Sequence, residues 1–276
     1  MANSERAQGA VREVPGAAAL ADRAASDFVE EYHHRPGAPI AVVIPALNEA
    51  ETVADVIESV PESICGLKTE TILVDDGSTD GTGDIARRAG ALVCSLPVNL
   101  GQGQAFRLGY RLARERGSRI ICTADADGQF DPRELPRLVE PIVSGDADFV
   151  NGSRRLGRTE TTDPVRKAGV ILYGALVSML TGVRITDPAN GLRAFRAQVT
   201  DRVPLRQTQY QTSELLIGAI AHGFKVIEAP ATMYKRSAGT SKKGGNLVYG
   251  LRFGRVVVTT WWAQRASARA STTGRG

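Results

Sequence analysis

Two aspartates one residue apart follow an apolar run that predicts a buried strand. Asp125 and Asp127 come after residues 120–122, and Gln129 stands two positions further on. Hard cations such as Mg²⁺ and Mn²⁺ take oxygen ligands and often bridge one or two carboxylates to the phosphates of a substrate. The segment therefore predicts a divalent metal site made by Asp125, Asp127 and the amide oxygen of Gln129, in an enzyme that acts on a phosphorylated donor.

Two other interpretations of this segment can be weighed from its residues. An Asp-x-Asp-Gly sequence is also typical of an ordinary turn, because Asp and Gly suit turn backbones, and this alternative stays open. A calcium loop of the EF-hand kind is excluded. It requires Gly at its sixth position and Glu at its twelfth, where this chain has Phe130 and Pro136.

The charge of the chain is unevenly distributed. Residues 151–276 contain 20 Lys and Arg against 6 Asp and Glu, a formal +14, whereas the whole chain is +4, so residues 1–150 carry −10. A basic second half predicts contact with anions, supplied by phosphate, a membrane surface or nucleic acid. Nucleic acid is disfavoured as a partner, because only 5% of the residues are aromatic and no known nucleic-acid-reading motif is present.

Length and cysteine usage bound the class of protein. The 276 residues suffice for one large domain or two small ones. The three cysteines (Cys65, Cys94 and Cys122) are scattered, and two lie in apolar runs, which predicts buried thiols in a reducing compartment. The first residues lack a positively charged and then apolar leader, so we expect a cytoplasmic protein.

From residue 39 onward, short apolar runs alternate with segments typical of helices. This alternation predicts an α/β fold with a mostly parallel twisted sheet and helices on both faces. Ligands of such sheets lie outside the carboxyl ends of the strands, so the polar segments 45–49, 75–76, 99–103 and 125–127 should meet at one edge. We expect strands at 40–44, 71–74, 92–95, 119–123, 149–151 and 225–229, and helices at 51–60, 84–89, 104–116 and 133–143, the first capped by Asn48.

The chain divides into three parts. We expect residues 1–38 to form a tail with one helix at 17–32 and residues 39–245 to form the main domain. Residues 246–276 should form a C-terminal amphipathic helix with a basic end. That last helix should carry Leu247, Leu251, Gly254, Val258 and Trp261 on one face.

Two segments could meet a membrane surface. The 16 residues 168–183 are uncharged, but a span needs about 20, so we expect a buried or interfacial helix. Trp261 and Trp262 stand near Arg265, a combination that suits a headgroup layer. The alternative for the C-terminal helix is packing on the core, and the two interpretations have equal weight.

A glycine-rich segment, residues 99–104, opens a predicted helix. Gly101 and Gly103 could let backbone N–H groups approach a phosphate at the helix N-terminus. The dinucleotide-binding fingerprint is excluded because Phe106 occupies its third glycine position, and a Walker A loop is excluded because Gly-Lys-Ser/Thr is missing.

Taken together, the motifs resemble those of family 2 glycosyltransferases. The resemblance covers residues 40–245 and is closest to the dolichyl-phosphate mannose synthase-like (polyprenyl-phosphate sugar transferase) subgroup. The chain departs from the family at Gln102, where the glycine-rich loop usually has lysine, which puts donor choice in doubt. The motifs are Val43-Ile44-Pro45-Ala46-Leu47-Asn48-Glu49, Val74-Asp75-Asp76-Gly77-Ser78, Asn99-Leu100-Gly101, Asp125-Ala126-Asp127-Gly128-Gln129, Asp187-Pro188-Ala189-Asn190-Gly191-Leu192-Arg193, Ser213-Glu214 and Arg236-Ser237-Ala238-Gly239-Thr240-Ser241-Lys242.

What the resemblance implies is a GT-A fold, a GDP- or UDP-linked sugar as donor, and Mg²⁺ or Mn²⁺ held by Asp125, Asp127 and Gln129. Asp187 and Arg193 would lie near the acceptor, and Arg236 and Lys242 would meet the donor phosphates. The remaining donor-binding residues would be Pro45, Ala46, Asn48, Glu49, Asp76, Gly101, Gly103 and Ala126.

The function expected from these residues is metal-dependent, inverting transfer of a sugar to a polyprenyl phosphate at the cytoplasmic membrane face. An acceptor phosphate needs no general base, whereas a hydroxyl acceptor would need Asp187 or Glu214 to take its proton. Two alternatives stay open: transfer to a glycan or small-molecule hydroxyl, and a nucleotide-sugar-binding module without turnover. Arg193 could also simply pair with Asp187, and Glu214 could cap a helix. The expected catalytic residues are Asp127, Asp187, Arg193, Glu214 and Arg236.

Overall fold

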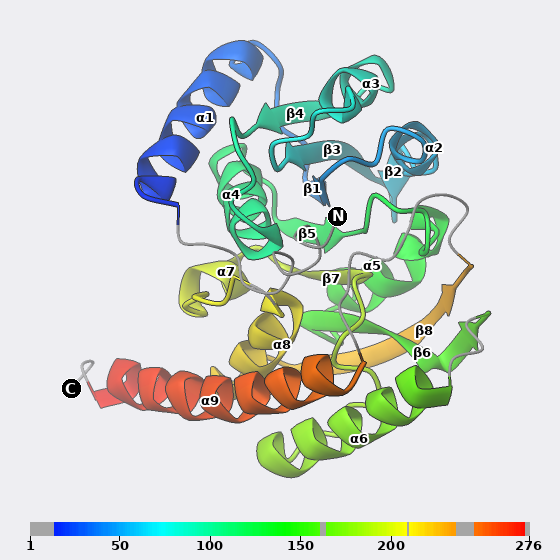
Figure 1. The fold of residues 1–276 in the computed structure, drawn as a ribbon, viewed down its shortest axis with the longest axis vertical. Coiled ribbons are helices and arrows are strands. Elements are labelled where there is room, and N and C mark those ends of the chain that lie inside the picture. Colours follow the sequence, from blue (N-terminus) through cyan, green and yellow to red (C-terminus); the bar gives the residue numbers. More distant parts are fainter. Residues whose placement is uncertain (1–13, 161–163, 209, 236–245, 274–276) are drawn as a thin grey trace, which may run out of the picture.

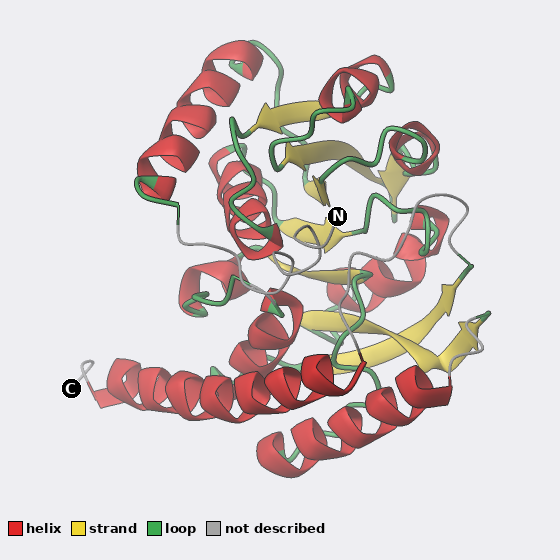
Figure 2. Ribbon diagram, viewed as in Figure 1, coloured by secondary structure: helices red, strands yellow, loops and turns green. Residues whose placement is uncertain are grey.

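The computed structural model describes residues 14–160, 164–208, 210–235 and 246–273 (Figure 1). In this part of the chain the strands form an eight-stranded sheet with helices on both faces (Figure 2). The strands are β1 (Ile40–Ala46), β2 (Ser63–Ile64), β3 (Leu67–Asp75), β4 (Leu92–Ser95), β5 (Ile120–Thr123), β6 (Phe149–Thr159), β7 (Arg193–Arg196) and β8 (Val226–Met233). The helices are α1 (Ala17–Tyr32), α2 (Val53–Glu58), α3 (Thr82–Arg88), α4 (Gln102–Glu115), the 3-10 helix η1 (Pro132–Glu134), α5 (Leu135–Val143), α6 (Pro164–Thr181), α7 (Gln198–Arg202), α8 (Gln211–Ala221) and α9 (Asn246–Thr273).

The sheet is mixed and mostly parallel. Its strand order is β2-β3-β1-β5-β7-β6-β8, with β4 also paired to β3. Strand β1 runs parallel to β3 and β5, and β6 runs parallel to β8, whereas β7 is antiparallel to both of its neighbours. The predicted α/β fold is therefore confirmed. Strand β7, which separates the two parallel parts of the sheet, was not predicted from the sequence.

Both faces of the sheet are buried. Ala41 and Val43 of β1 pack in the apolar cluster that includes α1, α4 and α8, whereas Ile40, Val42 and Ile44 pack in the cluster that includes α2, α3 and α5. Successive side chains of a strand point to opposite faces. A central parallel strand must therefore be apolar at every position, which explains the unbroken apolar run of β1.

Helix α1 has the predicted bounds and belongs to the core. Its buried face includes Ala25, Phe28 and Tyr32. The Tyr32 hydroxyl accepts a hydrogen bond from the Val93 N–H of β4 at 3.2 Å. The sequence predicted a tail with one helix, and the packing of that helix on the core was not predicted. Most of its buried residues are alanines, which contribute little to an apolar period.

The long helices α6 and α9 lie side by side at the lower edge of Figure 1, where a Cβ at Gly254 would come 3.6 Å from Tyr173 Cε1. The buried face of α9 contains Val257 and Gln264, whereas Val258 is exposed, so the predicted apolar face was wrong at this position. The Gln264 side-chain amide donates to the Pro204 carbonyl at 2.7 Å. A buried polar residue of this kind is not detected by a search for apolar periodicity. Among the described residues, no helix has the length and apolar character needed to cross a bilayer.

Candidate active site

The carboxyl ends of the central parallel strands meet at one edge of the sheet. Ala46 of β1 is the register partner of Asp75 on β3, and the Asp76 N–H donates to the Ala46 carbonyl at 2.8 Å. Strand β5 flanks β1 on the other side, so Asp125 follows it at the same edge. The predicted donor-binding residues in this part of the molecule are Pro45, Ala46, Asn48, Glu49, Asp76, Gly101, Gly103 and Ala126.

Hydrogen bonds join the loop after β1 to the loop after β3. Asn48 has a φ of 51°, in the left-handed region that Asn tolerates better than most residues. Its N–H donates to Ser78 Oγ at 2.9 Å, and its side-chain oxygen accepts from the Thr79 N–H at 2.9 Å. The Glu49 N–H donates to Thr82 Oγ1 at 2.9 Å. The prediction that Asn48 caps α2 was wrong, because its side chain orders this loop pair instead.

Asp76 is bound to the glycine-rich loop. Its carboxylate accepts the N–H groups of Leu100 at 2.7 Å and Gly101 at 2.9 Å. Burial raises the pKa of Asp76 to about 6, against the effect of these two hydrogen bonds. The N–H of Gly101, which the sequence suggested for a phosphate, is therefore engaged by a carboxylate in this structure.

The start of α4 is covered by the loop that precedes α8. The Gly103 N–H donates to the Thr208 carbonyl at 3.0 Å, and a Cβ at Gly103 would lie 2.3 Å from the Gln207 carbonyl oxygen. Glu214 is buried and accepts the Gln207 N–H at 2.9 Å, and burial raises the pKa of Glu214. Glu214 thus holds this loop from inside, and its role as a proton acceptor stays a prediction.

Asp125 and Asp127 are half-buried on the loop after β5. Asp127 Oδ1 accepts the Gln129 N–H at 3.0 Å, and Thr52 Oγ1 donates to the Ala126 carbonyl at 2.8 Å, which fixes the loop. Within the described residues, no group of three or more His, Cys, Asp or Glu side chains could hold a metal ion. Two carboxylates fit a hard cation that takes its other ligands from water and a diphosphate. Asp125 and Asp127 would hold Mg²⁺ or Mn²⁺ in this way, and Gln129 remains a predicted third ligand.

Asp187 is fully buried and pairs with Arg154, not with Arg193. The Nε and Nη2 groups of Arg154 each donate to one carboxylate oxygen at 2.6 Å, a bidentate geometry. Burial alone would raise the pKa of Asp187, but the bonds from Arg154 outweigh it and hold that pKa below its usual range. A carboxylate in this state is a poor proton acceptor.

Arg193 is bonded to the main chain around it. Only 1% of the residue is exposed, and its guanidinium donates to the carbonyls of Asn190 at 2.8 Å, of Pro188 at 3.0 Å and of Thr212. Burial lowers the pKa of Arg193 to about 10, which leaves it charged at neutral pH. In this position Arg193 holds the main chain at Pro188 and Asn190, and its role near the acceptor, which the resemblance implied, stays a prediction.

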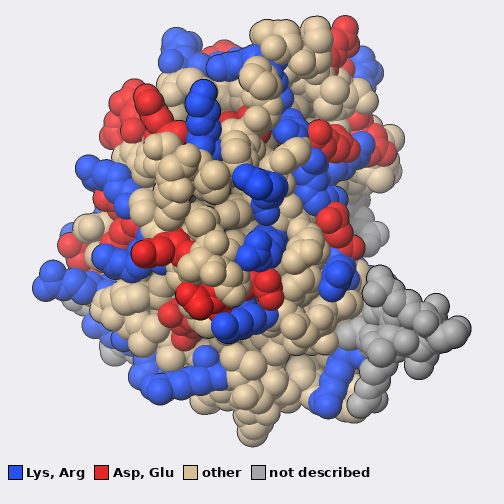
Figure 3. All heavy atoms as spheres, turned by 180° about the vertical axis from the view of Figure 1, so that it is seen from behind, with Lys and Arg blue, Asp and Glu red and all other residues tan. Residues whose placement is uncertain are grey.

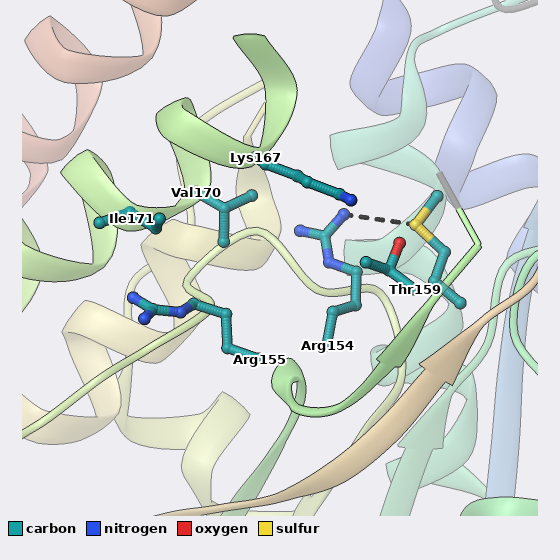
Figure 4. A pocket seen from close by; sticks show the side chains of 7 residues that line it. Arg154, Arg155, Thr159, Lys167, Val170 and Ile171 are labelled. Carbon is teal, nitrogen blue, oxygen red and sulfur yellow. Dashed lines mark hydrogen bonds between the residues drawn. The ribbon is translucent and has the colours of Figure 1, made fainter. Parts of the chain in front are cut away.

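A pocket of about 210 Å³ opens beside Arg154, between the start of α6 and the ends of β6 and β8 (Figure 4). Lys167 reaches from α6 toward Arg154, and Ile171 and Val170 form an apolar wall. This pocket was not predicted from the sequence, although two adjacent cations, Arg154 and Arg155, after the buried residues 149–153 were an available signal. The lining residues are Arg154, Arg155, Thr159, Lys167, Val170, Ile171 and Met233.

Strand β8 connects this pocket to the carboxylate loop. Met233 lines the pocket and forms an antiparallel β-bridge with Phe130. The next residue, Tyr234, donates its N–H to the Gln129 carbonyl at 2.9 Å. The end of β8 therefore lies beside both the pocket and the loop that carries Asp127. Arg236 and Lys242 lie outside the described residues, so their predicted contacts with the donor phosphates stay predictions.

The sequence of the chain is similar to those of known proteins. The sequence model of glycosyl transferase family 2 matches residues 41–203. The chain is 32% identical over 224 residues to the undecaprenyl-phosphate mannosyltransferase of Micrococcus luteus, covering 76% of this chain and 89% of that protein. It is also 32% identical over 224 residues to the polyprenol monophosphomannose synthase of Mycolicibacterium smegmatis, covering 77% of this chain and 83% of that protein.

A solved structure supports the fold. Glucosyl-3-phosphoglycerate synthase from Mycobacterium tuberculosis, in complex with Mn²⁺, uridine diphosphate and phosphoglyceric acid, superposes with a TM-score of 0.62. The match covers 87% of this chain and 82% of that one at 24% sequence identity. The fold is thus the GT-A fold of that enzyme.

Proposed function

Because the chain belongs to glycosyl transferase family 2 and is a glycosyltransferase, we propose that it moves a sugar from a GDP- or UDP-linked donor to a polyprenyl phosphate, with inversion and with Mg²⁺ or Mn²⁺. The observation that carries the proposal is the pocket beside Arg154. Its apolar wall and its cations suit an acceptor with an apolar chain and an anionic head. The two relatives named for undecaprenyl-phosphate and polyprenol substrates support the same acceptor class.

The side chains divide the chemistry between donor and acceptor. Asp125 and Asp127 would hold a divalent cation, which would supply positive charge against the negative charge that develops on the leaving diphosphate. Arg154, fixed by Asp187, would hold the acceptor phosphate, with Lys167 adding a second cation. An acceptor phosphate is already an anionic nucleophile, and direct displacement by it inverts the anomeric carbon.

The pKa of Asp187 favours a phosphate acceptor over a hydroxyl. A hydroxyl acceptor requires a group that takes its proton in the transition state. Of the two carboxylates suggested for that task, Asp187 is a weak base because its ion pair with Arg154 lowers its pKa, and the Glu214 carboxylate already accepts the Gln207 N–H inside the protein. Neither arrangement serves a general base, whereas a phosphate needs none.

A panel of donors and acceptors tests the proposal. We expect nucleoside diphosphate release when the protein is incubated with Mn²⁺, a GDP- or UDP-sugar and a short polyprenyl phosphate such as farnesyl phosphate. Farnesol, which lacks the phosphate, is the matched control and should give no release above hydrolysis. Release with sugar hydroxyls in place of farnesyl phosphate would contradict the proposal. Donor binding without release under any condition would indicate the binding module.

We also propose that the protein works at the cytoplasmic face of a membrane, where its acceptor is anchored. Met179 on α6 is 75% exposed and Trp262 on α9 is 66% exposed. Arg265 lies over the Trp261 ring, 5.1 Å from its centroid. Figure 3 shows Lys and Arg on either side of an uncharged lower edge, where Figure 1 places α6. Exposed apolar and aromatic side chains flanked by cations suit an anionic lipid surface.

Replacing the exposed apolar side chains should weaken lipid binding. Burying one such side chain contributes about 1.5–3 kcal/mol, so we expect Met179→Gln with Trp262→Gln to lower partitioning onto anionic liposomes at least about tenfold. Liposome flotation measures the partitioning. Val143→Gln, which alters an exposed apolar residue on α5, is the matched control and should not change it. Equal flotation of the double variant and the wild type would show that the exposed side chains of α6 and α9 do not bind the membrane.

A further inference from the structure

We propose that residues 186–191 set the positions of the metal-binding carboxylate and the acceptor arginine together, with Gly191 and Glu228 as positioning residues. This inference rests on the proposed function. It adds that one segment of the chain fixes the donor-binding and acceptor-binding side chains relative to each other. The segment precedes β7, and its ends contact Thr123 of β5 and Asn151 of β6. Arg193 donates to the carbonyls of Asn190 and Pro188 within it. One end of it meets Asp125, and the other end carries Asp187.

Gly191 lies directly against the carboxylate of Asp125. A Cβ at position 191 would come 2.2 Å from Asp125 Oδ2 and 2.8 Å from its Cγ, closer than side-chain atoms approach each other. Thr123 Oγ1 donates to the Gly191 carbonyl at 2.6 Å and holds this contact in place. Because residue 191 is glycine, the Asp125 carboxylate can occupy the space that a side chain at position 191 would fill.

Glu228 of β8 fixes the other end of the segment. Its Oε2 accepts both the N–H and the hydroxyl of Thr186, each at 2.7 Å, and its Oε1 accepts the Asp187 N–H at 3.1 Å. The Asn151 amide donates to Glu228 Oε1 at 3.0 Å and to the Asp187 carbonyl at 2.8 Å. These bonds hold the main chain of Asp187, whose side chain in turn holds Arg154 at the pocket.

The two contacts predict separate effects on the two substrates. Gly191→Ala is compatible with the backbone, since the φ of Gly191 is outside the left-handed region. The new methyl group must displace the Asp125 carboxylate, so we expect affinity for Mn²⁺ with a nucleoside diphosphate to fall about tenfold or more, as for other changes that shift a metal ligand. Glu228→Gln should weaken farnesyl phosphate binding about tenfold while the Mn²⁺ affinity stays within a factor of two to three.

Binding measurements test this without relying on turnover. The EPR signal of free Mn²⁺, recorded with UDP and separately with GDP, reports the donor side, and calorimetric titration with farnesyl phosphate reports the acceptor side. Two matched controls disturb the structure away from the site. In Gly218→Ala the new Cβ would lie 2.2 Å from Val203 Cγ1. Asp148→Asn changes the carboxylate that accepts the Lys225 N–H at the opposite end of β8. Both controls should keep both affinities.

The pattern of losses decides the proposal. The proposal is wrong if Gly191→Ala or Glu228→Gln lowers both affinities equally. It is also wrong if Gly191→Ala leaves the Mn²⁺ affinity unchanged and Glu228→Gln leaves the farnesyl phosphate affinity unchanged. Should either variant fail to fold, Thr123→Val and Thr186→Val remove the supporting hydroxyls and must give the same separation. A wild type that binds neither probe also overturns it. A wild type that binds both probes but transfers no sugar refutes only the proposed function.

Discussion

Asp127→Asn should reduce sugar transfer at least about a thousandfold, because a cation that stabilises the leaving diphosphate is worth several kcal/mol in the transition state. Asparagine keeps the Oδ1 atom that accepts the Gln129 N–H at 3.0 Å, so the loop should stay folded. The substitution removes only the negative charge. Nucleoside diphosphate release at saturating donor measures the effect, and the free Mn²⁺ signal should show weaker binding in parallel.

A carboxylate in the same loop provides the control for this variant. Asp131 pairs with Arg133 at 2.9 Å and caps η1. Asp131→Asn should leave turnover within about threefold of wild type, since its partner Arg133 lies at the surface and a surface ion pair contributes at most about 1 kcal/mol. If Asp127→Asn retains a tenth or more of the wild-type rate while Mn²⁺ is still required, the cation is held elsewhere, and the interpretation of Asp127 is wrong.

The donor side of the site could be predicted from sequence because its signals are local. Residues 40–44 and 120–122 are unbroken apolar runs, as buried parallel strands require, and each is followed by polar residues. Parallel strands then bring those polar residues to one edge. The structure places Asp76 and Asp125 there from segments distant in sequence.

The proposed acceptor side could not be predicted from the residues, because its contacts join segments that only the fold brings together. Arg193 is close to Asp187 in sequence, which suggested an ion pair, but β7 turns Arg193 into the core. Asp187 meets Arg154 of β6 instead. Strand β7 itself is four residues long with arginine at both ends, so it carries no apolar signal.

The same limit applies to α8 and its loop. Glu214 follows a segment with no regular period, and nothing local shows that its carboxylate binds the N–H of Gln207. The fold creates that contact by laying residues 205–208 over the start of α4. A carboxylate in a motif can therefore be structural, and only its partners distinguish this role from catalysis.

Asp187→Asn should lower the free energy of unfolding by about 3–5 kcal/mol, because it leaves the charge of Arg154 almost buried without its counter-ion. The Arg154 side chain is only 9% exposed and that of Asp187 is fully buried. Asparagine can still accept the Arg154 main-chain N–H, which bonds to Asp187 Oδ2 at 3.1 Å. The loss therefore reports the ion pair. Urea denaturation at pH 7 measures it.

The pH dependence of this loss has a definite sign. The pKa of Asp187 is lowered in the folded protein, so the pair stabilises the fold fully above the unfolded pKa of about 3.9, and that stability is lost as pH falls through the lower folded value. The stability difference between wild type and Asp187→Asn should thus be constant from about pH 7 to pH 5 and shrink below about pH 4. A difference that shrinks as pH rises would contradict the ion pair.

A double variant separates the structural role of the pair from its role at the acceptor. Arg154→Met with Asp187→Asn removes both charges and places an apolar side chain beside Met233, so it should be more stable than Asp187→Asn alone. Its KM for farnesyl phosphate should nevertheless remain at least about tenfold above wild type, since charge-assisted bonds to a phosphate contribute about 1.5–3 kcal/mol. Stability that returns together with acceptor affinity would show that Arg154 acts only on the fold and does not bind the acceptor.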